Sequence, residues 1–227
     1  MNVAESMVAS WLRHEKCCQL VQCNLRCSPK WSRDSEGEVA IWCKGLKNEL
    51  SNGVGADGTK VYKIFKGGQH RNGVNVSNVL KQMEIDVFGY DFKDNKVWAC
   101  EVAYHKGGCL YGRSTKSTVE KILEKLIRAY VFWKVCIKQG TSLNLVFVTP
   151  FISDKCAECL KEIVKVARAK LQEINAPVSI QLILGDDVVD QITNKILELE
   201  NESGIDDIFV RTAGLLHGNI NKPVKKL

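Results

Sequence analysis

The chain has 227 residues, of which 26% are charged and 45% hydrophobic, a balance typical of a globular protein with a buried core. No apolar run is long enough for a transmembrane helix, and the N-terminus lacks the pattern of a secretory signal. We therefore expect neither membrane insertion nor secretion. The expected location is cytoplasmic, with the ten cysteines as reduced thiols.

The positive charge of the chain is concentrated before residue 151. Residues 1–150 hold 22 Lys and Arg against 14 Asp and Glu, a balance of +8. Residues 151–227 hold 10 against 12, a balance of −2. Five basic residues and no acidic residue lie within 60–81. A basic half favours a polyanionic partner such as nucleic acid, and the alternative is an ordinary solvated surface.

The first part of the chain is predicted to begin with a helix over 2–14 and a strand over 17–26. Residues 30–82 are interpreted as an insertion. Within it, a helix is predicted over 38–50 and a strand over 60–65.

The rest of the chain alternates strands and helices. Strands are predicted over 83–90, 96–105, 143–148 and 178–184, and helices over 117–137, 154–174 and 187–199. Ser117 and Glu120 are predicted to form a capping box at the first of these helices. A hairpin followed by crossovers implies an α/β fold, a mixed sheet with helices on its faces. We expect a single domain over 1–202 and an irregular tail over 203–227.

Two acidic side chains interrupt the apolar runs of the predicted hairpin. Asp86 lies in its first strand and Glu101 in its second, each between apolar neighbours. A carboxylate in such a place is costly unless it is paired or binds a metal. Two acids on adjacent antiparallel strands can converge on one hard cation such as Mg²⁺. The alternative is that lysines or backbone donors satisfy both carboxylates.

On these residues and on the order of its elements, the chain resembles the PD-(D/E)XK nuclease superfamily, which has the restriction-endonuclease-like fold. That family has an α-β-β-β-α-β core, with an Asp on the second core strand and Glu-x-Lys on the third. The resemblance covers about residues 2–28 and 83–184. It implies that Asp86 and Glu101 are catalytic ligands of Mg²⁺ or Mn²⁺, and that Glu5 is the catalytic Glu of the first helix.

The sequence departs from the family at the lysine, whose position is occupied by Ala103. His105 lies two residues further on and shares a face of the predicted strand with Glu101. Histidine can act as a general base near neutral pH, so His105 is a candidate catalytic residue in place of the lysine. The alternative is a histidine near solvent at the end of a strand.

Basic residues near this site and in the insertion are candidates for contacts with phosphate groups. Arg113 and Lys116 lie just before or at a helix N-terminus, where backbone amides can also bind phosphate. An ordinary loop arginine is the alternative for Arg113. The candidate nucleic-acid-binding residues are Lys60, Lys63, Lys66, His70, Arg71, Lys106, Arg113 and Lys116.

The sequence thus favours a magnesium-dependent endonuclease, a hydrolase that cleaves phosphodiester bonds in DNA. Ala103 favours an alternative, a nucleic-acid-binding member of the same fold that has lost catalysis. A second alternative is an unrelated α/β domain that binds proteins. The expected partner is nucleic acid, with DNA favoured and RNA left open, and no membrane. A second copy of the chain, forming a homodimer, is also allowed.

Overall fold

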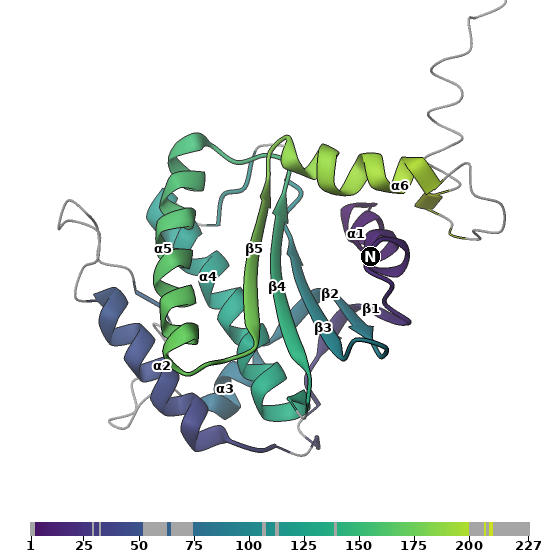
Figure 1. Cartoon of the computed structure of the whole chain (residues 1–227). Helices are drawn as coiled ribbons and strands as arrows, with labels where there is room; N and C mark the ends of the chain where they lie inside the picture. The colour runs from purple at the N-terminus through teal and green to yellow at the C-terminus, as the bar shows by residue number, and fades with distance from the viewer. Residues whose placement is uncertain are drawn as a thin grey trace, which may run out of the picture.

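A five-stranded mixed sheet forms the centre of the computed structural model, and helices cover both of its faces (Figure 1). The structure describes residues 3–28, 30–31, 33–51, 63–64, 75–105, 108–111, 114–138, 140–199, 207 and 209–210. The strands lie side by side in sequence order: β1 (Leu20–Arg26), β2 (Glu84–Asp91), β3 (Lys96–Val102), β4 (Ser142–Thr149) and β5 (Val178–Leu184). The predicted α/β class with a mixed sheet is therefore confirmed.

The direction of the strands changes within the sheet. β1, β2 and β3 pair antiparallel, whereas β3, β4 and β5 pair parallel. A tight turn joins β2 to β3. There the amides of Lys93 and Asp94 donate to Asp91 Oδ1 at 3.0 and 3.3 Å, and Asn95 adopts a positive φ of 51°. Parallel neighbours need a crossover, and helices supply both crossovers after β3.

The helices form a layer on each face of the sheet (Figure 1). Their bounds are α1 (Val3–His14), α2 (Glu36–Ser51), α3 (Val76–Lys81), α4 (Thr115–Phe132), α5 (Asp154–Glu173) and α6 (Asn194–Glu198), with π-helical turns η1 (Trp133–Ile137) and η2 (Val189–Thr193). α1 and α6 cover one face, and α2, α3, α4 and α5 lie on the other. No helix in the described part of the chain is both long and apolar enough to cross a membrane.

The alternation of β3 divides its side chains between two hydrophobic cores. Val97 and Ala99 belong to the larger core, which α4 and α5 complete. Cys100 and Val102 belong to the smaller core beside α1. Glu101 has the parity of Val97 and Ala99, so its carboxylate lies on the side of α4.

Part of the predicted insertion over 30–82 belongs to the larger core. Leu46 and Leu50 of α2 are fully buried there, and Trp42 Nε1 donates to the carbonyl of Lys170 on α5 at 3.1 Å. Of the strand predicted over 60–65, only Lys63 and Ile64 are described, and neither is in a strand.

The capping of α4 differs from the prediction. The helix begins at Thr115, with Ser114 as its N-cap and Ser117 as the reciprocal partner. Glu120 lies one turn further into the helix, where its Oε1 accepts from the amide of Lys63 at 2.7 Å. The predicted Ser117–Glu120 box is therefore wrong, because this carboxylate binds a distant backbone amide instead.

The region predicted as an irregular tail has a buried anchor. Asp207 and Val210 are 8% and 3% exposed, and Val210 joins the smaller core. Ser10 Oγ on α1 donates to Asp207 Oδ1 at 2.8 Å, and Arg13 forms an ion pair with Oδ2 at 3.2 Å. This contact holds the described residues near 207–210 against α1.

Candidate active site

Asp86 and Glu101 lie where β2 and β3 separate. The last paired residues of the two strands are Val87 and Cys100, so continuing the register places Asp86 opposite Glu101. Asp86 Oδ2 accepts from the amide of Val102 at 2.8 Å, so this carboxylate binds the backbone of β3 beyond the last paired residues. Opposite residues of antiparallel strands share a face, and both carboxylates lie on the α4 side.

A lysine from α4 joins the two carboxylates. Lys125 Nζ lies 2.5 Å from Glu101 Oε2 and 3.4 Å from Asp86 Oδ2. We call these three residues the acid–lysine cluster. Each comes from a different element, since β2 supplies Asp86, β3 supplies Glu101 and α4 supplies Lys125. The structure therefore brings together the two predicted acids.

Sequence reasoning missed Lys125, which the apolar stripe of α4 assigned to the polar side of the helix. The side chain is only 23% exposed and points to the sheet. The available signal was its position three residues after Ile122, at the border of the stripe. From such a border a long side chain can reach back to acids on the sheet.

Burial and charge shift the proton affinities of the cluster. Burial raises the pKa of Glu101 to about 8; Lys125 opposes this shift, and the neighbouring carboxylate of Asp86 adds to it. Burial alone would lower the pKa of Lys125, but Glu101 and Asp86 outweigh it, so the pKa is raised. Lys125 thus stays charged beside a carboxyl group that holds a proton near neutral pH.

The buried carboxyl group of Glu101 is incompletely satisfied. Its residue is 1% exposed, and among the described residues its Oε1 has no hydrogen-bond partner with normal geometry, although the carboxyl group of Asp86 lies close by. An unpaired buried oxygen of this kind is costly, and a bound cation is one way to satisfy it. The carboxylate oxygens match the ligands that Mg²⁺ prefers, although the described residues hold no group of three or more His, Cys, Asp or Glu side chains that could bind a metal. Mg²⁺ commonly takes only one or two carboxylates, with water and phosphate completing its shell, so this donor set fits.

His105 lies outside the position predicted for it. β3 ends at Val102, so the predicted strand over 96–105 is three residues too long and strand alternation does not place His105. Beyond the strand, the chain turns, with the amide of Gly108 donating to the carbonyl of His105 at 2.9 Å. The exposed His105 ring packs edge-on against Tyr111, with centroids 5.8 Å apart.

Tyr111 is a second residue that the sequence did not single out. The centroid of its ring is 6.0 Å from Lys125 Nζ, so it borders the acid–lysine cluster. Burial raises its pKa to about 12, which keeps the phenol protonated. Its backbone amide donates to Thr118 Oγ1 at 3.0 Å, which fixes the loop to the first turn of α4. Tyr111 thus connects His105 to Lys125 through ring contacts.

Glu5 approaches the sheet from the other side. Its helix, α1, covers the face opposite to α4 (Figure 1). Glu5 is 9% exposed, and its Oε2 accepts from Asn24 Nδ2 of β1 at 3.5 Å. Glu5 and Lys125 therefore lie on different faces of the sheet.

Most of the predicted phosphate contacts fall where the structure gives no description. Lys63 and Lys116 are described, and both side chains are exposed; Lys116 lies in the first turn of α4. The other candidates lie outside the described residues: Lys60, Lys66, His70, Arg71, Lys106 and Arg113.

Comparisons with known proteins do not identify a relative. No protein family, curated protein or solved structure matches the chain. The geometry of the acid–lysine cluster is therefore the main indication of what the protein does.

Proposed function

We propose that the chain is a metal-dependent nuclease with a restriction-endonuclease-like core, which hydrolyses phosphodiester bonds in DNA with Mg²⁺ or Mn²⁺. The observation that carries this proposal is the buried Oε1 of Glu101, which lies beside a second carboxyl group and has no hydrogen-bond partner in the part of the chain that the structure describes. The order α1-β1-β2-β3-α4-β4, apart from the inserted α2 and α3, supports the choice of core.

Asp86 and Glu101 are the residues that hold the metal in this proposal. When bound, the cation stabilises negative charge that develops on a phosphodiester. The amide of Val102 fixes Asp86 from behind, so the position of this carboxylate is set before any ligand binds. A fixed ligand group loses little conformational entropy on binding, which favours a defined site.

Lys125 takes the role that the family gives to the lysine of Glu-x-Lys. It stands on α4 instead of β3, but its ammonium contacts both carboxylates, which supports it over the loop residue His105. Its raised pKa keeps the ammonium charged, so Lys125 orients groups and stabilises negative charge. The ring of Tyr111 lies beside this ammonium, with its centroid 6.0 Å from Nζ.

One observation favours the alternative of a binding protein without catalysis. Lys125 already contacts both carboxyl groups, so the cluster can serve as a structural network without a metal. This alternative predicts DNA binding that needs no divalent cation and no cleavage of the strand.

Cleavage of a labelled DNA duplex with Mg²⁺ and with Mn²⁺ tests the proposal. Asp86→Asn and Glu101→Gln should abolish cleavage, and Lys125→Met should slow it by about 10²–10³-fold, as expected for loss of one stabilising donor. Lys121→Met is the matched control, because Lys121 is exposed on the same helix. Absence of cleavage by the parent protein, with DNA binding retained, would establish the binding-only alternative.

His105→Ala tests whether His105 or Lys125 takes the role of the family lysine. Because His105 contacts Tyr111 and not the cluster directly, we expect a smaller loss of rate than for Lys125→Met. A loss of about 10²–10⁴-fold in His105→Ala, the size expected for a general base, would return this role to the histidine.

The salt dependence of DNA binding tests the predicted basic surface. Each phosphate neutralised on duplex DNA contributes about −0.9 to the slope of log affinity against log salt. Replacing Lys63, Lys66 and Arg71 by Ala should flatten this slope. The backbone contact from Lys63 to Glu120 survives the change, so a slope that stays the same would exclude this segment as the binding surface.

A further inference from the structure

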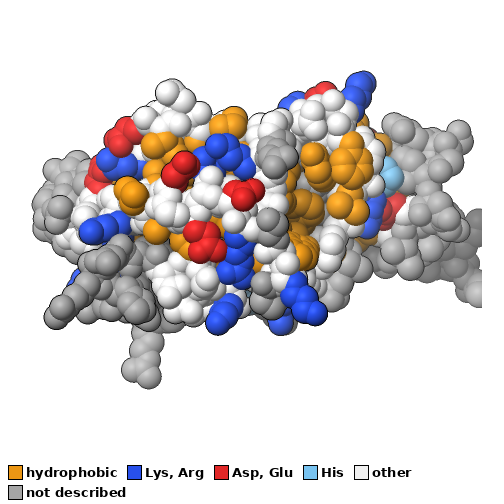
Figure 2. Space-filling model, turned by 90° about the horizontal axis from the view of Figure 1, so that it is seen from below, with side chains coloured by type: hydrophobic (Ala, Val, Ile, Leu, Met, Phe, Trp, Pro, Cys, Tyr) orange, Lys and Arg blue, Asp and Glu red, His pale blue; other side chains and the backbone are white. Residues whose placement is uncertain are grey.

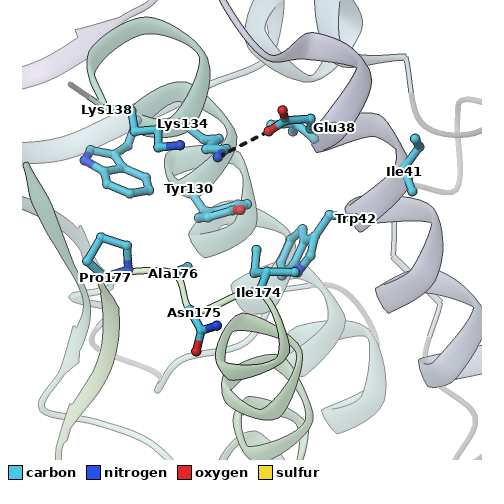
Figure 3. Close-up of a pocket in the computed structure, with 12 residues that line it drawn as sticks. Glu38, Ile41, Trp42, Tyr130, Lys134, Lys138, Ile174, Asn175, Ala176 and Pro177 are labelled. Atoms are coloured by element: carbon cyan, nitrogen blue, oxygen red, sulfur yellow. Dashed lines mark ion pairs between the residues drawn. The ribbon is translucent and has the colours of Figure 1, made fainter. Parts of the chain in front are cut away.

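A cavity of about 490 Å³ lies between α2, the end of α4 with η1, and the loop that leads from α5 into β5. We call it the aromatic pocket (Figure 3). Its volume and its mainly apolar walls are those of small-molecule sites. It is separate from the acid–lysine cluster, because Lys134 is nine residues beyond Lys125, about 13 Å along a helix axis.

Three rings form the aromatic wall of this pocket. The centroid of Tyr130 lies 4.5 Å from that of Trp42 and 6.1 Å from that of Trp133. Trp42 Nε1 donates to the carbonyl of Lys170, and Trp133 Nε1 donates to Thr141 Oγ1 at 2.8 Å. The indoles are therefore fixed from behind, and the wall needs little reorganisation to receive a flat ligand.

The hydroxyl of Tyr130 makes no hydrogen bond to any residue that the structure describes, although its residue is only 1% exposed. Burial raises its pKa, so the group remains a protonated donor. In Figure 3 it points toward α2, into the space bordered by Glu38 and Trp42. A hydroxyl at a cavity wall that makes no hydrogen bond to a described residue is open to a polar atom of a ligand.

Two lysines give the pocket an excess of positive charge. Lys134 Nζ lies 3.4 Å from Glu38 Oε2, and Lys138 forms no ion pair with a described residue. The proximity of Lys134 lowers the pKa of Lys138, because two ammonium groups close together repel each other. Seen from this end of the molecule, Lys, Arg, Asp and Glu side chains surround hydrophobic ones at the surface (Figure 2). The pocket thus joins apolar rings to an incompletely neutralised cation pair.

We propose that the aromatic pocket binds a nucleotide, an aromatic base that carries a phosphate monoester. The base would pack on the wall of Trp42 and Tyr130, and the phosphate would bind Lys134 and Lys138. A doubly charged phosphate matches two ammonium groups better than a single carboxylate does. The Tyr130 hydroxyl would meet a polar atom of the base or sugar. The ligand is a free mononucleotide or the terminal nucleotide of a strand, since both offer this chemistry.

Among the described residues that line the pocket, Glu38 is the only acidic one, and it competes with the phosphate for Lys134. It is 72% exposed, so it can turn toward solvent when an anion binds. Removing its charge should therefore strengthen binding, an effect that a damaged fold cannot imitate.

Calorimetric titration of the full chain with adenosine 5′-monophosphate and uridine 5′-monophosphate tests the proposal. The matched nucleosides and inorganic phosphate should each bind at least about tenfold more weakly, because each lacks half of the recognised chemistry. An oligonucleotide with a 5′-phosphate separates the two sources: tighter binding than the mononucleotide identifies a strand end, and weaker binding identifies a free nucleotide.

Four variants locate the binding. Lys138→Met should weaken binding about tenfold, the loss of one charge-assisted contact, and Tyr130→Phe should weaken it less. Glu38→Gln should strengthen it. Lys165→Met, at an exposed lysine of α5 outside the pocket, should leave it unchanged. The proposal would be overturned if neither mononucleotide binds, or if the nucleosides bind as tightly as the mononucleotides. It would also be overturned if Lys138→Met and Glu38→Gln leave the affinity unchanged. Nuclease activity has no part in this test.

Discussion

The acid–lysine cluster and the aromatic pocket lie along one helical segment, yet they handle charge in opposite ways. In the cluster, Lys125 reaches inward to two carboxylates that the sheet holds on its buried face. In the pocket, Lys134 and the exposed Lys138 lie beside aromatic rings and, among the described residues, a single exposed carboxylate, that of Glu38. The carboxyl oxygens of the cluster are therefore suited to bind a cation, whereas the lysines of the pocket are suited to bind an anion.

Lysines of one helical segment can therefore serve different purposes, because the side chains that surround each lysine differ. Lys125 extends from the border of the apolar stripe and faces Asp86 and Glu101 across the larger core. Lys138 follows the π-helical turn at the end of the segment, where Glu38 forms its ion pair with Lys134 and no described acid forms one with Lys138.

The largest expected difference between the two regions is in stability. Lys125→Met leaves the buried carboxyl group of Glu101 and the half-buried one of Asp86 without their counter-charge, so the free energy of unfolding should fall by about 3–5 kcal/mol. Lys138→Met changes an exposed lysine, and the same quantity should change by less than about 0.5 kcal/mol. Urea unfolding at pH 8 measures both. Equal changes in the two variants would contradict the distinction drawn between the regions.

The pH dependence of stability should follow the cluster. Glu101 has an ordinary pKa of 4.5 that the fold raises to about 8, so the folded state binds this proton more tightly than the unfolded state does. Without divalent metal, the contribution is fully present below pH 4.5 and is lost as pH rises through about 8. Glu101→Gln cannot titrate and should flatten this decline, whereas Lys138→Met should preserve it. A parent protein that gains stability from Glu101 on going from pH 5 to pH 8 would contradict the raised pKa.

Divalent metal should stabilise the cluster and leave the pocket unaffected. A cation that binds only the folded chain raises its stability by about 2.7 kcal/mol at a hundred times the dissociation constant. The melting temperature at pH 8 should therefore rise with Mg²⁺ or Mn²⁺, and Asp86→Asn should remove the rise. Lys134→Met serves as the control in the pocket, where the metal response should survive.

The smallest expected effect is at the pocket wall. Tyr130→Phe removes a hydroxyl that has no hydrogen-bond partner among the described residues, so the ring contacts with Trp42 and Trp133 remain. The free energy of unfolding should stay within about 0.5 kcal/mol of the parent value or rise slightly. A loss above about 1 kcal/mol in a thermal or urea titration would reveal a hydrogen bond that occupies this hydroxyl and would weaken the case for a ligand there.

Local patterns in the sequence determined much of the sheet and its acids. Alternation in the hairpin indicated β2 and β3, and the turn residues 91–95 set their register. That register placed Asp86 and Glu101 on one face, since opposite positions of antiparallel strands share a face. The apolar stripe of α4 and the buried run of β4 similarly indicated the crossover that makes the sheet mixed. These features depend on periods of two and 3.6 residues, which act over short distances along the chain.

Only the tertiary structure decided which groups meet the acids and which cavity forms. Lys125 lies 24 residues from Glu101 and 39 from Asp86, and its contact with both depends on the rotation of α4 against the sheet. His105 left the predicted face because β3 ends at Val102 and the chain turns there. The aromatic pocket needs Trp42 from α2, Tyr130 from α4 and Ile174 after α5. Periodicity fixes which side of an element is apolar, but the partner of that side is set by packing between distant segments.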